Sequence, residues 1–283
     1  MLKRIYNRLK WSSYSLLAFF VKEKRVKFEN REFKISINNS HEFHRAVTFH
    51  SKEKDTLAWL KNYLGFDFVD IGANIGIYSL FFSKISQNSK IYSFEPDASS
   101  FISLVKNISV NSLTNIKAFC IAIGRKKGFY EMNFHEYISG AGAGSIDSEY
   151  KFTNSKNKRK YIQQTLCMTL DDCAELITSN KCIVKIDVDG PEYEIIESAK
   201  EFLSSKKVES VLIEINSKCE NDKQKIFSLM KSYGFNKIYQ GNWIDDYKMF
   251  EIANYFFFKS STFNLTDKNL KLLFKEVIFK VEL

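Results

Sequence analysis

The chain has 283 residues, a length that fits one large domain with an extension. Hydrophobic residues make up 45% of it and aromatic residues 15%, which is enough for a substantial core and excludes a disordered chain. The formal net charge of +9 is compatible with a nucleic acid, an anionic membrane or a phosphorylated substrate, but a lysine-rich, well-solvated surface explains it more simply.

The first 25 residues predict an N-terminal helix with a cationic start. Its early basic residues are Lys3, Arg4, Arg8 and Lys10. They precede an apolar run over 11–21 that serines interrupt. No stretch reaches the roughly 18 apolar residues that a membrane-spanning helix needs. We therefore expect this helix to pack on the domain, with peripheral membrane contact through residues 1–25 as the alternative.

A short hairpin and a second helix follow. The segments 26–29 and 32–37 read as its two strands, and 51–64 carries apolar residues at helical spacing among charges. We expect a helix-and-hairpin extension over residues 1–50 and the main domain over residues 51–283.

From residue 66 onward, apolar strands alternate with amphipathic helices. The predicted core strands cover 66–71, 90–94, 116–123, 182–188 and 211–216. The predicted helices cover 75–86, 99–110, 170–178 (capped by Thr169), 191–204 and 220–233. Further strands are predicted over 128–134 and 162–168, and a closing antiparallel hairpin over 235–239 and 254–259. This alternation is the pattern of a parallel sheet with crossover helices.

A glycine-containing turn joins the first core strand to its helix, in the sequence FVDIGANIG over 68–76. Gly72 lets the backbone turn sharply and approach a ligand, and Gly76 lets the helix start pack closely on the strand. The turn lies at the carboxyl end of the strand, where open α/β sheets bind ligands. By itself, this spacing predicts only a packing turn.

Two acids beside the turn change that interpretation. Glu95 ends the second strand about 20 residues on, where nucleoside-binding folds place an acid on the ribose hydroxyls. Asp70 precedes the turn, where a carboxylate repels the pyrophosphate of a dinucleotide but favours the ammonium and sulfonium of S-adenosylmethionine. Because the G-x-G-x-x-G spacing is missing as well, the sequence favours an S-adenosylmethionine site over an NAD site.

The fourth core strand ends in a group of acids. They are Asp187, Asp189, Glu192 and Glu194. Asp187 stands at the carboxyl end of the strand among apolar neighbours, which favours a role in the site. For Glu192 and Glu194, complementing the dipole of the next helix is an equally good explanation. Lys185 would be buried in the middle of the sheet, so we expect an ion pair between it and one of these acids.

Five segments together resemble the FkbM family of methyltransferases. They read FVDIGANIGIYS at 68–79, SFEP at 93–96, TLDD at 169–172, VKIDVDGPEYEIIESA at 184–199 and VLIEI at 211–215. They occur in the order of that family and span about half of the chain. Asp189 and Pro191 stand where the family more often shows Glu and Ala.

The resemblance implies a fold and an activity. The fold is the class I methyltransferase fold, a Rossmann-like α/β fold with a mostly parallel seven-stranded sheet, an antiparallel last strand and helices on both faces. The activity is S-adenosylmethionine-dependent O-methylation of a hydroxyl on a sugar, a glycan precursor or a secondary metabolite.

Site residues carry over from the family one by one. The residues expected along the methionine part of the cofactor are Asp70, Gly72, Asn74 and Gly76. The resemblance also implies that Glu95 takes the ribose, that Ala122 lies near the adenine and that Asp187 lies beside the transferred methyl.

A hydroxyl acceptor is a poor nucleophile, so we expect a general base to take its proton. Asp187 is the first candidate, followed by Asp189, Glu192 and Glu214. His135 is another, because it precedes a glycine-rich segment over 140–145 that is either a flexible surface loop or a lid over the substrate.

A metal-dependent variant is an alternative to this mechanism. Oxygen ligands from Asp187, Glu214 and Asn216, at the ends of neighbouring strands, would suit a magnesium ion that holds a diol acceptor. The main interpretation assigns no metal ligand.

Other functions are weighed against this one. A nucleic-acid methyltransferase would use the positive charge, but the Asn/Asp-Pro-Pro-Tyr motif typical of base-nitrogen methylation is missing after the fourth strand, and no RNA-recognition module is visible. We therefore expect a small-molecule or saccharide acceptor and no nucleic acid. A non-catalytic binding protein on the same fold is the remaining alternative, and the set of Asp70, Gly72 and Glu95 argues against it.

The five cysteines bear on the compartment. They form no C-x-x-C pair, and several lie in apolar runs, which argues against a disulfide framework and a structural zinc site. We therefore expect a cytoplasmic protein.

Overall fold

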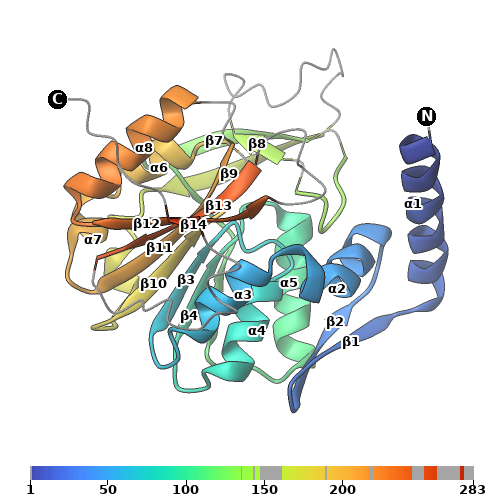
Figure 1. Ribbon diagram of the computed structural model, residues 1–283. Helices are drawn as coiled ribbons and strands as arrows, with labels where there is room; N and C mark the ends of the chain where they lie inside the picture. The colour runs from blue at the N-terminus through green and yellow to red at the C-terminus, as the bar shows by residue number, and fades with distance from the viewer. Residues whose placement is uncertain are drawn as a thin grey trace.

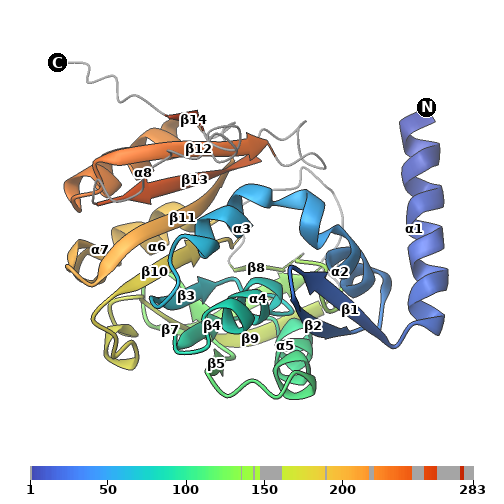
Figure 2. The same ribbon diagram turned by 60° about the horizontal axis from the view of Figure 1, so that its bottom comes forward.

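A computed structural model of the chain describes residues 2–134, 136–142, 144–146, 161–188, 190–216, 220–243, 252–259 and 275–276. It is an α/β fold in which a large twisted sheet has helices on both faces and a smaller sheet beside it (Figures 1 and 2). Within the described residues, no helix is both long enough and apolar enough to cross a membrane.

The central sheet has the strand order β14-β12-β13-β11-β10-β3-β4-β5. In that order the strands are Lys275–Glu276, Lys237–Trp243, Ile252–Phe258, Val208–Asn216, Cys182–Ile186, Asp67–Ile71, Ile91–Phe94 and Ile116–Phe119. The five strands from β11 to β5 are parallel, and β13 runs antiparallel to both of its neighbours. The predicted class I methyltransferase fold is therefore confirmed, with the two-residue β14 added outside the seven core strands.

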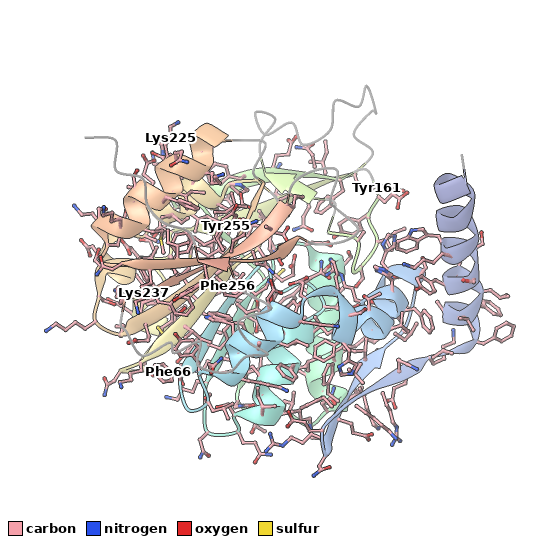
Figure 3. The ribbon with its side chains drawn as sticks, viewed as in Figure 1. Phe66, Tyr161, Lys225, Lys237, Tyr255 and Phe256 are labelled. Carbon is pink, nitrogen blue, oxygen red and sulfur yellow. The ribbon has the colours of Figure 1, made fainter. Side chains whose placement is uncertain are left out.

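The two faces of this sheet carry two separate hydrophobic clusters. Because side chains alternate along a strand, Val69 and Ile71 face one cluster while Phe68 faces the other. Figure 3 marks the same alternation in β13, where Tyr255 belongs to the first cluster and Phe256 to the second. Strands buried on both faces explain why the sequence shows continuous apolar runs rather than alternation.

Helices cover both faces. The first cluster is covered by α6 (Glu192–Glu197), α7 (Lys200–Ser204) and α8 (Glu220–Ser232). The second is covered by α2 (Ser40–Lys52), α3 (Lys54–Lys61) and α4 (Ile77–Ile85). Helix α5 (Ala98–Val110) packs against β5 and against β2 (Arg31–Ser36).

The N-terminal part begins with α1 (Leu2–Phe20) and the hairpin of β1 (Glu23–Phe28) with β2, which confirms the predicted helix and hairpin. Helix α2 was not predicted, and the Asn39 side chain caps it by accepting from two backbone N–H groups. Apolar side chains of the hairpin and α2 belong to the same cluster as those of α3 and α4. The domain boundary at 50/51 stays a prediction.

The predicted third strand, 116–123, is wrong as a single strand. Its first half is β5 in the central sheet, and its last two residues form β6 (Ala122–Ile123) in the smaller sheet. That sheet has the order β6-β9-β7-β8, with β9 at Tyr161–Met168, β7 at Gly128–Phe134 and β8 at Gly144–Ile146. The chain changes sheets here because β9 offers a parallel partner to Ala122 and Ile123.

Two helix predictions also need correction. Over 170–178 only a 3₁₀ turn forms, Ala174–Leu176, although the Thr169 hydroxyl does accept from the N–H of Asp172, as expected of a cap. The predicted helix 191–204 is split into α6 and α7. The split is explained by the Asp171 carboxylate, which accepts from the N–H groups of Glu201 and Phe202 and so starts a new helix there.

Candidate functional site

The glycine turn after β3 lies against the end of β10. Gly72 has a φ of +78°, and a Cβ at this position would overlap with the backbone carbonyl oxygen of Asp187. Gly76 caps α4 in the left-handed region, where a Cβ would overlap with the Leu104 side chain of α5. Both glycines are therefore required by close packing, as the sequence indicated, but the partner of Gly76 is a neighbouring helix rather than the strand.

Glu95 holds the turn from the other side. Its Oε2 accepts from the backbone N–H of Asn74 at 2.7 Å, and its Oε1 accepts from the N–H of Asp97 at 2.8 Å. Burial raises the pKa of Glu95 to about 7, although the two N–H donors act in the opposite direction. Each oxygen keeps a second lone pair, so the carboxylate is able to accept two further hydrogen bonds from a ligand.

Asp70 lies beneath the turn and not at its surface. Its Oδ2 accepts from the Ser79 hydroxyl at 2.5 Å, and Ser79 also shares a hydrogen bond with Ser93. Its Oδ1 is buried and has no hydrogen-bond partner among the described residues. Burial raises the pKa of Asp70, against the opposing charge of Lys185. Asp70 is therefore buried below the glycine turn, and its Oδ1 lacks a hydrogen-bond donor among the described residues.

The ion pair expected of Lys185 is present, and its partner is Asp187. The Lys185 Nζ lies 2.5 Å from Asp187 Oδ2, and their side chains are 2% and 25% exposed. Burial raises the pKa of Asp187, but the Lys185 ammonium outweighs burial and leaves that pKa below its ordinary value. Asp187 is therefore a charged carboxylate that one side chain holds in place while part of it faces outward.

Tyr78 and Glu53 lie close to the ion pair of Lys185 and Asp187. The Tyr78 ring lies under the Lys185 ammonium, 5.1 Å from nitrogen to ring centre. Burial raises the pKa of the Tyr78 hydroxyl, and the charge of Glu53 acts in the same direction. The Thr56 hydroxyl donates to Glu53 Oε2 at 3.2 Å. Glu53, between α2 and α3, is 5% exposed. Sequence reasoning missed both residues, and only the clustering of charges around 52–55 hinted at them.

A second buried acid, Asp55, lies beside this group. Its Oδ1 accepts from the N–H of Thr56, and its Oδ2 is buried without a hydrogen-bond partner among the described residues. Gly241 of β12 leaves the space that this carboxyl occupies, since a Cβ there would overlap with Oδ2. The Thr56 hydroxyl accepts from the amide of Asn254 in β13 at 3.1 Å. Burial raises the pKa of Asp55 to about 7.

Helix α2 supplies two cations, Arg45 and Lys52, near the same group of acids. The Arg45 guanidinium donates to the carbonyl of Gly140 at 2.7 Å, and Lys52 lies 3.8 Å from a Glu53 oxygen. The charges of Lys52 and Arg45 both contribute to the lowered pKa of Asp187, and Arg45 also acts on Glu95. The charge of Arg45 therefore acts on both acids that border the glycine turn.

The remaining predicted residues are placed differently. Asp189 and His135 lie outside the described residues. Glu192 starts α6 and accepts from the N–H of Gly190 at 2.9 Å, a structural contact of the kind expected at a helix start. Ala122 is buried in β6, where it pairs with Cys167.

The residues proposed for a magnesium ion are only partly placed. Glu214 neighbours Asp187 across the ends of β11 and β10, since Ile213 pairs with Ile186. The side chain of Asn216 is outside the described set. Within the part of the chain that the structure describes, no three His, Cys, Asp or Glu side chains cluster closely enough to hold a metal ion.

Comparison with known proteins adds a family match. The model of the family described as the methyltransferase FkbM domain matches residues 70–237. The curated protein "Methyltransferase 1" of Beauveria bassiana (strain ARSEF 2860) is 21% identical over 139 residues, which cover 45% of this chain and 56% of that protein. The chain thus spans little more than half the length of that relative.

Two solved structures illustrate the structural likeness. Methyltransferase FkbM from Methylobacillus flagellatus KT has a TM-score of 0.46 at 14% identity, covering 70% of this chain and 47% of that one. TYW2 from M. jannaschii, solved in complex with AdoMet, has a TM-score of 0.42 at 13% identity, covering 83% of this chain and 84% of that one.

Proposed function

Because the chain belongs to the FkbM methyltransferase domain family and is a methyltransferase, we propose that it transfers the methyl group of S-adenosylmethionine to a hydroxyl of a sugar, a glycan precursor or a secondary metabolite. The observation that carries the proposal is the position of two acids on either side of one glycine turn. Glu95 bonds to the N–H of Asn74 within the turn, and the backbone of Asp187 packs on Gly72. The two acids therefore border one candidate ligand-binding surface, which the glycine turn forms.

The residues at this surface fit the proposed cofactor. Glu95 would accept from the two ribose hydroxyls, with both oxygens already oriented by backbone N–H groups. Asp70 and Asp187 place negative charge beneath and beside the turn, which suits a ligand that carries an ammonium and a sulfonium. Asn74 and Gly76 would line the methionine part and Ala122 the adenine. When bound, the cofactor supplies a methyl group on a positively charged sulfur.

The acceptor would lie on the Asp187 side. In the transfer, the carbon–sulfur bond breaks as the carbon–oxygen bond forms, and the proton of the acceptor hydroxyl goes to a carboxylate of the protein. Asp187 is held by Lys185 and would fix the acceptor hydroxyl by accepting its hydrogen bond. Glu53 is another carboxylate on this side and would take the proton, with the Thr56 hydroxyl orienting it by donating to its Oε2. In-line positioning is the main contribution that such a site makes to the rate.

Among the proposed acceptors, a glycan precursor that carries a phosphate is favoured by the charges on α2. Arg45 and Lys52 act electrostatically on Asp187, so both lie near the place assigned to the acceptor. Cations at this position would attract an anionic group and partly offset the acids of the site.

We also propose a reducing compartment such as the cytoplasm. The four cysteines in the described part of the chain are free thiols. Burial raises the pKa of Cys167 to about 11 and of Cys173 and Cys182 to about 12, so these thiols act as apolar side chains and not as nucleophiles.

A binding measurement and a product measurement test the proposal. Isothermal titration calorimetry with S-adenosylmethionine should show one site, and E95Q should weaken binding by about 10- to 100-fold because a charged acceptor is lost. Mass spectrometry should then find a product heavier by one CH₂ when sugar phosphates are offered with the cofactor. E53Q should lower kcat by about 100-fold with little change in cofactor affinity.

The control is E131Q, which removes an exposed acid of β7 in the smaller sheet and should leave both measurements unchanged. Absence of cofactor binding at high micromolar concentration would make the chain a non-catalytic member of its fold. Methylation of RNA but of no saccharide would favour the nucleic-acid alternative. Loss of activity in a strong chelator would revive the magnesium mechanism with Asp187 and Glu214.

A further inference from the structure

Helix α1 packs on the rest of the protein through one side only. Trp11 contacts His41 and His44 of α2 with tilted rings, whose centres are 5.0 and 5.1 Å away. Tyr14 contacts Phe43 at 5.6 Å. Figures 1 and 2 show α1 at the margin of the molecule, with α2 as its neighbour. The side of α1 that faces the protein is therefore covered by α2.

The outer side of α1 is apolar and exposed. The exposed fractions are 63% for Leu16, 43% for Leu17, 70% for Phe19 and 71% for Phe20. Leu16 and Phe20 stand one turn apart on the side opposite Tyr14 and Ala18. Contiguous apolar surface of this kind marks a binding site and not ordinary surface.

The charge around this surface is of one sign. Residues 1–27 contain eight basic residues and one acid, Glu23. Lys22, Lys24 and Lys27 are exposed directly after the helix, and the Lys22 ammonium lies 5.7 Å from the centre of the Phe19 ring. A second copy of the chain would bring two such basic segments together, which repulsion disfavours. The complementary partner is an apolar surface bordered by negative charge.

We propose that α1 binds peripherally to the surface of an anionic lipid bilayer. Leu16, Leu17, Phe19 and Phe20 enter the boundary between headgroups and acyl chains, and the lysines that follow contact the anionic headgroups. The helix lies along the surface without crossing it, because its sequence is too polar to span the bilayer. Trp11, Tyr14 and α2 couple it to the body that carries the glycine turn, so the methyltransferase is held at the membrane.

Vesicle co-sedimentation of the full chain tests the proposal. Vesicles of phosphatidylcholine with about a quarter phosphatidylglycerol should pellet the protein, and phosphatidylcholine alone should pellet at least about five-fold less. F19S/F20S should lower the bound fraction on the anionic vesicles at least about five-fold, because the apolar anchor is lost. A shift to high salt should weaken binding of the unaltered chain, since the headgroup contacts are exposed.

The matched control is F129S, which replaces the 81% exposed Phe129 of β7 and should pellet like the unaltered chain. Both variants change exposed side chains, so their thermal unfolding and cofactor binding should match those of the unaltered chain. Equal binding of F19S/F20S and the unaltered chain would overturn the proposal, as would equal binding to neutral and anionic vesicles. A dimer in light scattering that F19S/F20S abolishes, without vesicle binding, would assign the surface to a second copy instead. None of these outcomes depends on the acceptor proposed above.

Discussion

Two ends of the candidate site are held together by different kinds of contact: the end proposed for the ribose, around Glu95, and the end proposed for the acceptor, around Asp187. At the ribose end, backbone N–H groups orient the carboxylate, and the donor from Asn74 is only 21 residues away in sequence. At the acceptor end, side chains hold one another, and they come from α2, α3, α4, β10 and β13. The hydrogen bond from Asn254 to Thr56 joins residues that are 198 positions apart.

This difference separates what is common to a cofactor site from what varies with the acceptor. Backbone donors are present whatever the side chains are, so a ribose site built on them tolerates sequence change around Glu95. Side-chain networks depend on every member, so the acceptor end changes when one residue changes. Gly72 is the point at which the two ends touch, because it packs on the carbonyl of Asp187.

The largest expected effect therefore comes from Gly72→Ala. The added Cβ would overlap with the Asp187 carbonyl, and φ of +78° is strained for alanine. We expect the free energy of unfolding to fall by more than about 3 kcal/mol, with loss of cofactor binding. Urea unfolding measures the first and calorimetry the second.

Gly65→Ala is the control for backbone strain alone. Gly65 has a similar φ of +85°, but a Cβ there meets nothing within 4 Å. We expect a loss of only about 1–2 kcal/mol and normal cofactor binding. Equal losses in the two variants would show that the contact between the turn and β10 is unimportant.

The next prediction compares how much each end of the site contributes to the free energy of unfolding. Asp187→Asn leaves the buried Lys185 ammonium without its closest partner, so the free energy of unfolding should fall by about 2 kcal/mol. Glu95→Gln leaves no buried cation behind, although its NH₂ group would face a backbone N–H that a carboxylate oxygen now accepts, so it should cost only about 1 kcal/mol. The double variant K185M/D187N should recover most of the loss, and chemical denaturation measures all three. A double variant as unstable as D187N would mean that the pair itself is not the source of the loss.

The sequence predicted that Glu95 and Asp70 lie beside the glycine turn, because the determinants of this arrangement are local. The glycine turn, Asp70 and Glu95 occupy fixed places relative to two strands that are recognisable from their apolar runs. Burial of Lys185 in the middle of a sheet required a nearby acid, and the chain supplied one two residues later. Each inference needed only the neighbouring sequence and the direction of parallel strands.

The acceptor end was not predictable in the same way. Glu53, Asp55 and Tyr78 look like ordinary residues of amphipathic helices, and only the packing of α2 and α3 over the sheet buries them together. The split of the predicted helix 191–204 had a similar origin, since Asp171 caps α7 from a distant segment. Packing between distant segments determines such features, and the residue pattern within one segment does not predict that packing.

A smaller effect concerns the pH dependence of cofactor binding. Burial raises the pKa of Glu95 to about 7, and only the ionised carboxylate accepts from both ribose hydroxyls. Cofactor affinity should therefore rise about ten-fold from pH 6 to pH 8 and level off above that. Calorimetry at several pH values checks this, with E95Q expected to lack that rise. An affinity of the unaltered chain that falls with pH, or that tracks E95Q, would contradict the ribose assignment.

The smallest expected effect concerns Asp55, at the end of the site proposed for the acceptor. It tests whether this acid is buried in the ligand-free protein without a full set of hydrogen bonds. Burial raises the pKa of Asp55 to about 7, above its value of 3.8 in the unfolded chain. Between these values the folded protein holds a proton that the unfolded chain releases, so this residue's contribution to stability is lost as pH rises. From pH 6 to pH 8, the unaltered chain should lose about 1 kcal/mol more stability than Asp55→Asn.

Urea unfolding at the two pH values gives the difference, and Asp222→Asn is the matched control, since Asp222 is a half-exposed acid of α8. That variant should follow the unaltered chain at both pH values. Parallel curves for D55N and the unaltered chain would mean that the Asp55 carboxyl is solvated and does not belong to a buried network. A separation of the expected sign would instead show that the fold buries this carboxyl, with Oδ2 left without a hydrogen-bond donor among the described residues.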